Sequence, residues 1–171
     1  PSGGDSLAVA ARGSNDVWAA GWDVGQPGII IHWDGTAWTS AVPSPNRFYG
    51  VWGSAANDVW AVGLGAFQRW NGTTWVSVPG QMGFRYGVWG SGTNDVWAVG
   101  ASPSVLHWDG TTWSSQIGAP ANTLRAVWGS GPSNAWAVGD NGAVAHWDGS
   151  SWTAISGVTQ NNLFGVWGRG S

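Results

Sequence analysis

The sequence of 171 residues contains no cysteine, no lysine and no glutamate, and only 9% of its residues are charged. Without cysteine the chain has no disulfide, no zinc–thiolate site and no thiol nucleophile. Without glutamate and lysine, the acid–base pairs open to an enzyme reduce to aspartate and histidine. The six basic residues are scattered arginines in a chain of net charge −3, so the basic stripe that binds nucleic acid is missing.

Long apolar runs are also absent. No stretch approaches the roughly 20 apolar residues that a transmembrane helix requires, so we expect no membrane span. Apolar residues nevertheless make up 43% of the chain, which is enough to give one domain an ordinary hydrophobic core. Many glycines, serines, threonines and tryptophans among few charges favour an exported bacterial protein, extracellular or at the cell surface.

A unit of about 38 residues occurs four times along the chain. Each copy contains a segment such as GVWGS, then one such as NDVWAVG, and then a turn framed by tryptophans. Self-similarity at this period indicates a repeat architecture. The turn is written HWDGTAW at 32–38, RWNGTTW at 69–75, HWDGTTW at 107–113 and HWDGSSW at 146–152.

Each unit contains four short segments of β-forming residues, bounded by Gly, Asn, Asp and Ser. An Asp-Gly or Asn-Gly pair between the third and fourth segments is the strongest short-range signal for a β-hairpin. No segment has helical periodicity with caps. A group of four antiparallel strands that repeats about every 40 residues is typical of the blades of a β-propeller. We therefore predict an all-β fold, a β-propeller made of four-stranded antiparallel blades.

The ends of the chain do not match. We predict a single propeller domain in which the first unit opens with residues 6–14 and carries Arg12 where later units carry tryptophan. The chain then contains five segments of the first-strand type, but only four sets of the second, third and fourth strands. The surplus strand either completes a blade at the ring seam or docks on another chain.

Four blades could close into a ring alone, but an eight-bladed homodimer joined through the terminal strands is slightly favoured. The domain covers 1–171, with repeats at about 5–45, 46–82, 83–121 and 122–160 and the extra strand at 161–171.

Sixteen of the 17 tryptophans occupy four fixed positions of the repeat, and Trp22 alone lies outside them. In the segment DVWAVG at 58–63, Trp60 and Val62 project to one face of a strand, and Val59 and Ala61 project to the other. A large face against a small face suits the wedge-like stacking of blades. We therefore expect the indoles to be buried between blades.

The repeated turns and the histidines before them have a structural and a functional interpretation. As scaffold, the Asp or Asn accepts backbone hydrogen bonds and the glycine takes a positive φ; as a site, Trp and Asp would bind a sugar. The scaffold role is favoured. The histidines are expected to be half-buried and hydrogen-bonded within a blade, since one His and one Asp are too few ligands for a metal. The residues are Asp34, Asn71, Asp109 and Asp148, and His32, His107 and His146.

The residues VWGSGTNDVWAVG (88–100) and VLHWDGTTW (105–113) resemble bacterial propeller repeats of the BNR or photosystem-assembly-factor-like kind. The resemblance covers roughly residues 5–170 and implies blades, while such repeats serve sialidases, lectins and assembly factors alike. The Asp turn is shorter between Asp and Trp than the Asp box of sialidases. Because the chain has no glutamate, neither the nucleophile pair of sialidases nor the sugar site of fucose-binding propeller lectins can be carried over. A WD-repeat lineage ranks second, because the Gly-His dipeptide is missing.

Function is expected in the loops, which vary between units while the strands are fixed. The loops are small and polar, which suits hydrogen bonding to hydroxyl groups with aromatic stacking beside them. We expect no catalytic residue, no metal and no cofactor. The predicted ligand-binding residues are the aromatics Trp22, Tyr49, Tyr86 and Phe84, and the arginines Arg47, Arg85 and Arg125, which precede first strands at differing offsets.

These observations predict a non-catalytic binding module, a lectin-like propeller with several weak and related carbohydrate sites that gain through avidity. The alternative is a structural or protein-interaction propeller, as a segment of a larger surface protein. The partner is accordingly a glycan or a protein, and not nucleic acid.

Overall fold

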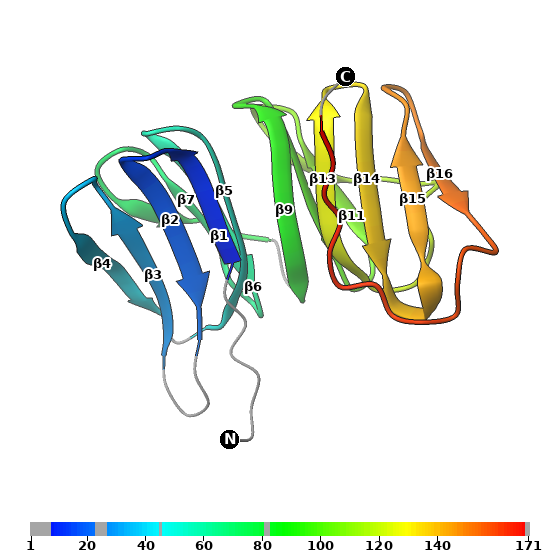
Figure 1. Ribbon diagram of the computed structural model, residues 1–171, viewed down its shortest axis with the longest axis horizontal. Helices are drawn as coiled ribbons and strands as arrows, with labels where there is room; N and C mark the ends of the chain where they lie inside the picture. The colour runs from blue at the N-terminus through cyan, green and yellow to red at the C-terminus, as the bar shows by residue number, and fades with distance from the viewer. Residues whose placement is uncertain (1–7, 23–26, 45, 81–82, 170–171) are drawn as a thin grey trace. The chain divides into compact units, whose positions relative to one another are not determined.

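The computed structural model describes residues 8–22, 27–44, 46–80 and 83–169, and the chain divides into two compact units, Pro1–Phe84 and Arg85–Ser171. Each unit contains two four-stranded antiparallel sheets (Figure 1). In every sheet the strands lie side by side in chain order. The prediction of an all-β fold of four-stranded antiparallel sheets is confirmed. The prediction of a single domain over 1–171 stays a prediction.

The described residues of the first unit form eight strands joined as two meanders. The first sheet consists of β1 (Ala8–Gly13), β2 (Asp16–Gly21), β3 (Gly28–Trp33) and β4 (Trp38–Ser44). The second sheet consists of β5 (Phe48–Ala55), β6 (Asp58–Gly63), β7 (Phe67–Trp70) and β8 (Trp75–Ser77).

The second unit repeats this arrangement. Its sheets are β9 (Arg85–Gly92), β10 (Asp95–Gly100), β11 (Val105–Trp108) and β12 (Trp113–Ser115), and then β13 (Leu124–Gly131), β14 (Asn134–Gly139), β15 (Val144–Trp147) and β16 (Trp152–Ile155). The helical content of the described residues is one 3₁₀ turn, η1 (Asp140–Gly142).

The four Asp-Gly and Asn-Gly turns are scaffold, as predicted. Asp34 Oδ1 accepts the backbone N–H groups of Thr36 at 2.8 Å and Ala37 at 2.9 Å, and the hydroxyl of Thr36 at 2.7 Å. Gly35 follows at φ +99°, and a Cβ on it would come within 2.8 Å of the Asn15 side chain. The turn thus needs glycine for its backbone and for its close approach to the neighbouring loop. Asn71, Asp109 and Asp148 make the same contacts.

Within each unit, the large face of one sheet packs against the small face of the next. In the first unit Trp18 and Ala20 of β2 share a buried cluster with Val59 and Ala61 of β6. In the second unit, likewise, the residues Trp97 and Val99 of β10 share a cluster with Ala135 and Ala137 of β14. Because strand side chains alternate, β6 can bury both of its faces. Trp60 is fully buried, and Trp97 is 1% exposed.

Glycine in the GVWGS segment makes room for a tryptophan of the preceding sheet. A Cβ on Gly129 of β13 would come within 2.4 Å of the Trp89 ring of β9, so only glycine lets the indole lie across the strand. The motif therefore serves packing between sheets as well as pairing within one.

The register of the first sheet corrects one sequence expectation. Ala10, and not Arg12, lies opposite Trp18, at the position that Trp52 occupies opposite Trp60. Arg12 instead matches Ser54, whose hydroxyl donates to Asp58. In β1 the same place brings Arg12 NH2 within 3.4 Å of Asp16 Oδ2. The first strand therefore lacks the inner tryptophan and binds the aspartate with an arginine.

The segment expected to form an extra strand at 161–171 is described as far as residue 169, and its residues 162–169 form no strand. It runs beside β13 in Figure 1.

The packing of tryptophan between sheets generates a prediction for stability. Replacement of Trp97 by alanine should lower the free energy of unfolding by about 3–5 kcal/mol, because it removes a buried indole and leaves a cavity. Urea denaturation followed by far-UV circular dichroism measures this. Trp38→Ala is the matched control, since Trp38 is 49% exposed and should change stability little. Equal losses in the two variants would contradict the packing role.

The turns generate a prediction for acid stability. Hydrogen bonds from Thr36 and Ala37 lower the pKa of Asp34 to about 2, and those from Ser150 and Ser151 do the same for Asp148. Because the folded pKa lies below the ordinary value of 3.8, these turns stabilise the fold above pH 4, and the contribution is lost as the pH falls through 2.

The double variant Asp34→Asn, Asp148→Asn provides the control, because Asn71 holds the equivalent turn as a neutral amide. Its stability should fall less between pH 4 and pH 2 than that of the unchanged protein in the same urea titrations. Parallel losses would show that the two carboxylates do not carry this pH dependence.

Candidate functional site

A pocket of about 460 Å³ lies between the two sheets of the first unit. One wall comes from β2, β3 and β4, and the other comes from β7, β8 and the turn between them. Aromatic rings and neutral hydroxyl and amide groups form nearly all of its lining. The lining residues are Trp18, His32, Thr39, Ser40, Gln68, Trp70, Thr73, Thr74 and Trp75.

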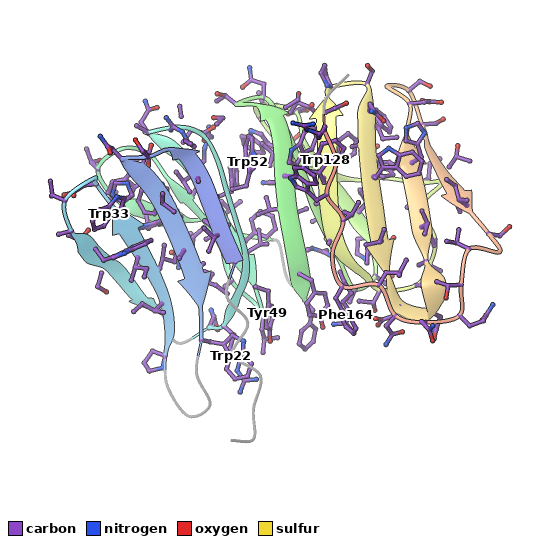
Figure 2. The ribbon with its side chains drawn as sticks, in the orientation of Figure 1. Trp22, Trp33, Tyr49, Trp52, Trp128 and Phe164 are labelled. Atoms are coloured by element: carbon purple, nitrogen blue, oxygen red, sulfur yellow. The ribbon has the colours of Figure 1, made fainter. Side chains whose placement is uncertain are left out.

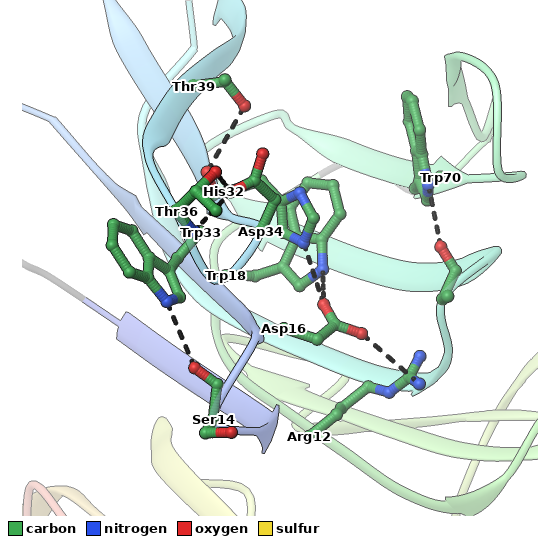
Figure 3. A network of polar contacts seen from close by, with 11 residues as sticks. Arg12, Ser14, Asp16, Trp18, His32, Trp33, Asp34, Thr36, Thr39 and Trp70 are labelled. Atoms are coloured by element: carbon green, nitrogen blue, oxygen red, sulfur yellow. Dashed lines mark hydrogen bonds and ion pairs between the residues drawn. The ribbon is translucent and has the colours of Figure 1, made fainter.

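The wall from the first sheet is a stacked pair of rings fixed by a carboxylate (Figure 3). Trp18 and His32 face each other across β2 and β3, with ring centroids 4.1 Å apart and planes 21° apart. Asp16 Oδ1 accepts from Trp18 Nε1 at 3.0 Å and lies 2.9 Å from His32 Nε2. The other carboxylate oxygen faces Arg12. The carboxylate of Asp16 is thus bound by residues of its own sheet.

The wall from the second sheet presents two more indoles. Trp70 and Trp75 lie opposite each other on β7 and β8, with centroids 5.8 Å and 5.5 Å from that of Trp18. Trp70 Nε1 donates to the carbonyl of Ala56 at 3.1 Å, which fixes its ring. Trp75 Nε1 and Gln68 Oε1 are buried and have no hydrogen-bond partner among the described residues. This wall therefore combines apolar ring surface with unused polar atoms.

The fixed ring pair recurs in the other sheets. Trp97, His107 and Asp95 repeat it, with 4.1 Å between the ring centroids and 2.6 Å from His107 Nε2 to the carboxylate. In the fourth sheet Asn134 replaces the aspartate, and in the second sheet Arg69 replaces the histidine and binds Asp58 at 2.7 Å. The prediction of half-buried histidines that bond within a blade is confirmed.

The second unit repeats the aromatic arrangement of the pocket. The centroid of Trp97 lies 4.7 Å from that of Trp147 and 5.2 Å from that of Trp152. Trp152 Nε1, like that of Trp75, is buried without a hydrogen-bond partner in the described part of the chain. The position of Gln68 is taken there by Ala145.

Three of the predicted site residues meet at one end of the first unit. The guanidinium carbon of Arg47 lies 3.8 Å from the centroid of the Trp22 ring, a cation–π contact. Tyr49 meets the same indole edge-on at 6.4 Å, and Figure 2 shows Trp22 and Tyr49 close together.

Two others meet in the second unit, where an aspartate joins them. Arg125 donates from Nε and NH2 to the two carboxylate oxygens of Asp140, each at 2.8 Å, and stacks 4.3 Å over Tyr86. The ion pair raises the pKa of Arg125 and lowers that of Asp140. The charge of this arginine is therefore already balanced.

The remaining two predicted residues lie apart. Arg85 is 2% exposed and donates from NH1 to the carbonyls of Ala101 at 2.7 Å and Pro103 at 2.8 Å, and burial lowers its pKa. Phe84 is 41% exposed and pairs with Leu64 in an isolated bridge. The register explains the scatter, because Arg85 occupies the buried ladder position of Phe48 and Leu124. Ligand binding by the seven predicted residues stays a prediction.

None of the pocket residues is among the seven predicted ligand-binding residues, but five of them belong to the turns at 32–38 and 69–75, for which a sugar site was the less favoured interpretation. A signal for them existed at one position of the repeat. Two residues before the third-strand tryptophan, the four units carry Ile31, Gln68, Leu106 and Ala145. A single glutamine among apolar residues, on a face that packs against another sheet, is the signal that distinguishes the lining of this pocket.

Among the described residues, no three His, Cys, Asp or Glu side chains are grouped so as to hold a metal ion. The same residues contain no helix that is long and apolar enough to cross a membrane.

No family model matches the chain, and no curated protein matches it. Solved structures do. YCF48 from Cyanidioschyzon merolae is 13% identical with a TM-score of 0.64, over 92% of this chain and 59% of that one. The WD40 repeats of RRP9 are 12% identical with a TM-score of 0.67, over 90% and 52%. The SapL1 lectin in complex with alpha methyl fucoside is 20% identical with a TM-score of 0.58, over 95% and 66%.

These similarities show that the chain has the fold of β-propeller blades. They support the resemblance to photosystem-assembly-factor-like propellers at the level of the fold. The chain spans between about half and two thirds of the length of each of these proteins.

Proposed function

We propose that the protein is a non-catalytic carbohydrate-binding propeller and that the pocket between the sheets of the first unit binds a neutral sugar. The observation that carries the proposal is the lining of this pocket, in which the indoles of Trp18, Trp70 and Trp75 stand beside hydroxyl and amide groups. A pyranose ring has the matching chemistry, because its C–H face is apolar and its rim carries hydroxyl groups.

The size and charge of the pocket favour this ligand. Its volume of about 460 Å³ falls in the range of roughly 300–1,000 Å³ that is typical of small-ligand sites. Arg12, Trp18 and His32 engage the carboxylate of Asp16, so the pocket offers no free charge to an ionic ligand. Hydroxyl groups of Thr39, Thr73 and Thr74 are suited to the rim of a sugar.

The covered polar atoms supply specificity. A sugar hydroxyl that reached Gln68 Oε1 or Trp75 Nε1 would satisfy an atom that now has no partner among the described residues. A buried polar atom left unpaired costs about 1–3 kcal/mol, so a ligand that completes it gains affinity. The amide of Gln68 can rotate to expose its oxygen, because the terminal torsion of glutamine is soft.

Two further observations support the proposal. The SapL1 lectin, whose structure contains alpha methyl fucoside, shares the fold. The indoles of Trp97, Trp147 and Trp152 repeat the aromatic wall in the second unit, and a second weak site there would add avidity. Binding of glycans accords with an extracellular or cell-surface location, which we propose from the composition.

A protein-interaction propeller is the second candidate. It is favoured by exposed apolar side chains, among them Phe164 at 71% and Trp167 at 78% exposure. Such groups are typical of surfaces that bind other proteins.

Screening on an array of neutral glycans followed by calorimetric titration tests the sugar proposal. Trp75→Ala should weaken binding at least tenfold, about 1.4 kcal/mol, since it removes one aromatic wall. Gln68→Leu should weaken it about threefold to tenfold, through the loss of one hydrogen bond, and keeps the fold because Leu106 is the residue of the third unit at this position.

Trp113→Ala is the matched control, because Trp113 occupies the position of Trp75 in the third sheet and does not line the pocket. It should leave the affinity unchanged. The proposal fails if no glycan binds, or if Trp75→Ala and Gln68→Leu bind as tightly as the unchanged protein.

A further inference from the structure

The hydrogen bonds to Asp16 determine which ring nitrogen of His32 carries a proton. Asp16 Oδ1 lies 3.0 Å from Trp18 Nε1 and 2.9 Å from His32 Nε2, and Figure 3 shows both rings at this one carboxylate. An indole N–H can only donate, and the oxygen of an ionised carboxylate can only accept. Asp16 therefore accepts from both rings, and His32 carries a proton on Nε2. In the neutral imidazole the other nitrogen, Nδ1, is then an acceptor.

The fourth sheet has the same arrangement of protons with a neutral amide. Asn134 Oδ1 lies 3.1 Å from Trp136 Nε1 and 2.8 Å from His146 Nε2, while its Nδ2 donates to the hydroxyl of Ser130. Because the amide oxygen accepts from the indole, His146 also carries its proton on Nε2. The arrangement therefore belongs to the repeat and does not require the charge of an aspartate.

Nδ1 of His32 is the ring nitrogen that remains for a ligand. The side chain of His32 is 27% exposed and lines the pocket together with Trp18. No residue in the described part of the chain forms a hydrogen bond with this nitrogen. A sugar hydroxyl can donate to it, as a hydroxyl group carries one proton for this purpose.

A second proton on His32 would give the pocket a positive charge. Asp16 is already paired with Arg12, whose NH2 lies 3.4 Å from Oδ2, so these two side chains together have no net charge. The other charged groups on the neighbouring elements are bound elsewhere. Asp34, in the turn after β3, accepts hydrogen bonds from its own turn, and Arg69 of β7 binds an aspartate of its own sheet. The pocket residues of β4, β7 and β8 carry no titratable group.

We propose that Nδ1 of His32 is a hydrogen-bond acceptor for the sugar, which binds while this nitrogen is unprotonated and leaves when it gains a proton. The inference rests on the proposed function of the pocket. Asp16 is the positioning residue, because it holds the imidazole in the tautomer that leaves Nδ1 free. When Nδ1 is protonated, the sugar hydroxyl loses its acceptor and the sugar has to cover an unbalanced charge, which lowers affinity.

The first measurement is the affinity for sugar as a function of pH. The probe is the neutral glycan that binds most tightly on the array, titrated by calorimetry from about pH 8 to about pH 5, the range in which histidine changes its charge. The affinity should fall about tenfold, as expected for one lost hydrogen bond in a pocket. An affinity that does not change with pH overturns this inference and leaves the proposed function intact. The absence of any bound glycan overturns both.

Two variants should move the pH of half-maximal affinity in opposite directions, by about 0.5–1 on the pH scale. Asp16→Asn introduces the residue of the fourth sheet, Asn134, and removes the negative charge beside His32, so the midpoint should move to lower pH. Arg12→Ser introduces the residue of the third sheet, Ser91, and removes the competing cation from the carboxylate, so the midpoint should move to higher pH. Shifts in the same direction, or no shift, overturn the proposal.

Replacement of His32 separates its nitrogen from its ring. His32→Phe keeps a flat ring against Trp18 and removes the acceptor, so binding at about pH 8 should weaken threefold to tenfold and should no longer change with pH. His107→Phe is the matched control, because His107 makes the same stack with Trp97 at 4.1 Å and does not line the pocket. It should leave the affinity and its pH dependence unchanged. A pH dependence that persists in His32→Phe overturns the proposal.

The tautomer itself can be measured without a ligand. Long-range nitrogen–proton correlation spectra distinguish the protonated from the unprotonated ring nitrogen in each of the three histidines, and the His32→Phe variant assigns the signals of His32. At about pH 8 the proton of His32 should be on Nε2, with Nδ1 unprotonated. A proton on Nδ1 under these conditions overturns the proposal whether or not a sugar binds.

Discussion

The structure depends on one packing constraint, the contact of a face rich in tryptophan with a face of small residues on the next sheet. Short strands of three to eight residues with few leucines bury too little surface by themselves to form a core. An indole such as Trp60 or Trp97 removes on the order of 150–250 Å² from water, so a single residue supplies what several aliphatic side chains supply elsewhere. The carboxylate–histidine clamp then keeps the ring flat against the sheet, as Asp16 and His32 do for Trp18.

Much of this was predictable from the sequence, because its signals are local and repeated four times. The Asp-Gly turns, the alternation in DVWAVG and the constant period determine the strands and their pairing. Hydrogen bonds of Asp34 within its own turn, and of His32 within its own sheet, need no knowledge of other blades. The resemblance to known propeller repeats pointed to the same fold.

The pocket could not be predicted in the same way, because it depends on how two sheets meet. Its walls use residues that every unit contains, such as Trp75, together with Gln68, which stands where the other units carry an apolar residue. The arginines show that residues with similar positions in the sequence can have different surroundings in the structure. Arg47, Arg85 and Arg125 look alike in the sequence, but a shift of one position places Arg85 in the interior and Arg125 on Asp140. Arg12 is a different case, because the sequence already places Ala10 eight residues before Trp18, as Trp52 stands before Trp60, and the register of β1 agrees with that spacing.

The two unlike faces of each sheet also bear on how such chains can change over generations. Each sheet packs through a tryptophan-rich face on one side and a face of small residues on the other. Any unit can therefore follow any other and make the same contact. A gene segment coding for about 38 residues can therefore be duplicated or lost as a whole. The number of units is then free to drift, while variation at a single small-face residue gives one gap between neighbours a chemistry of its own.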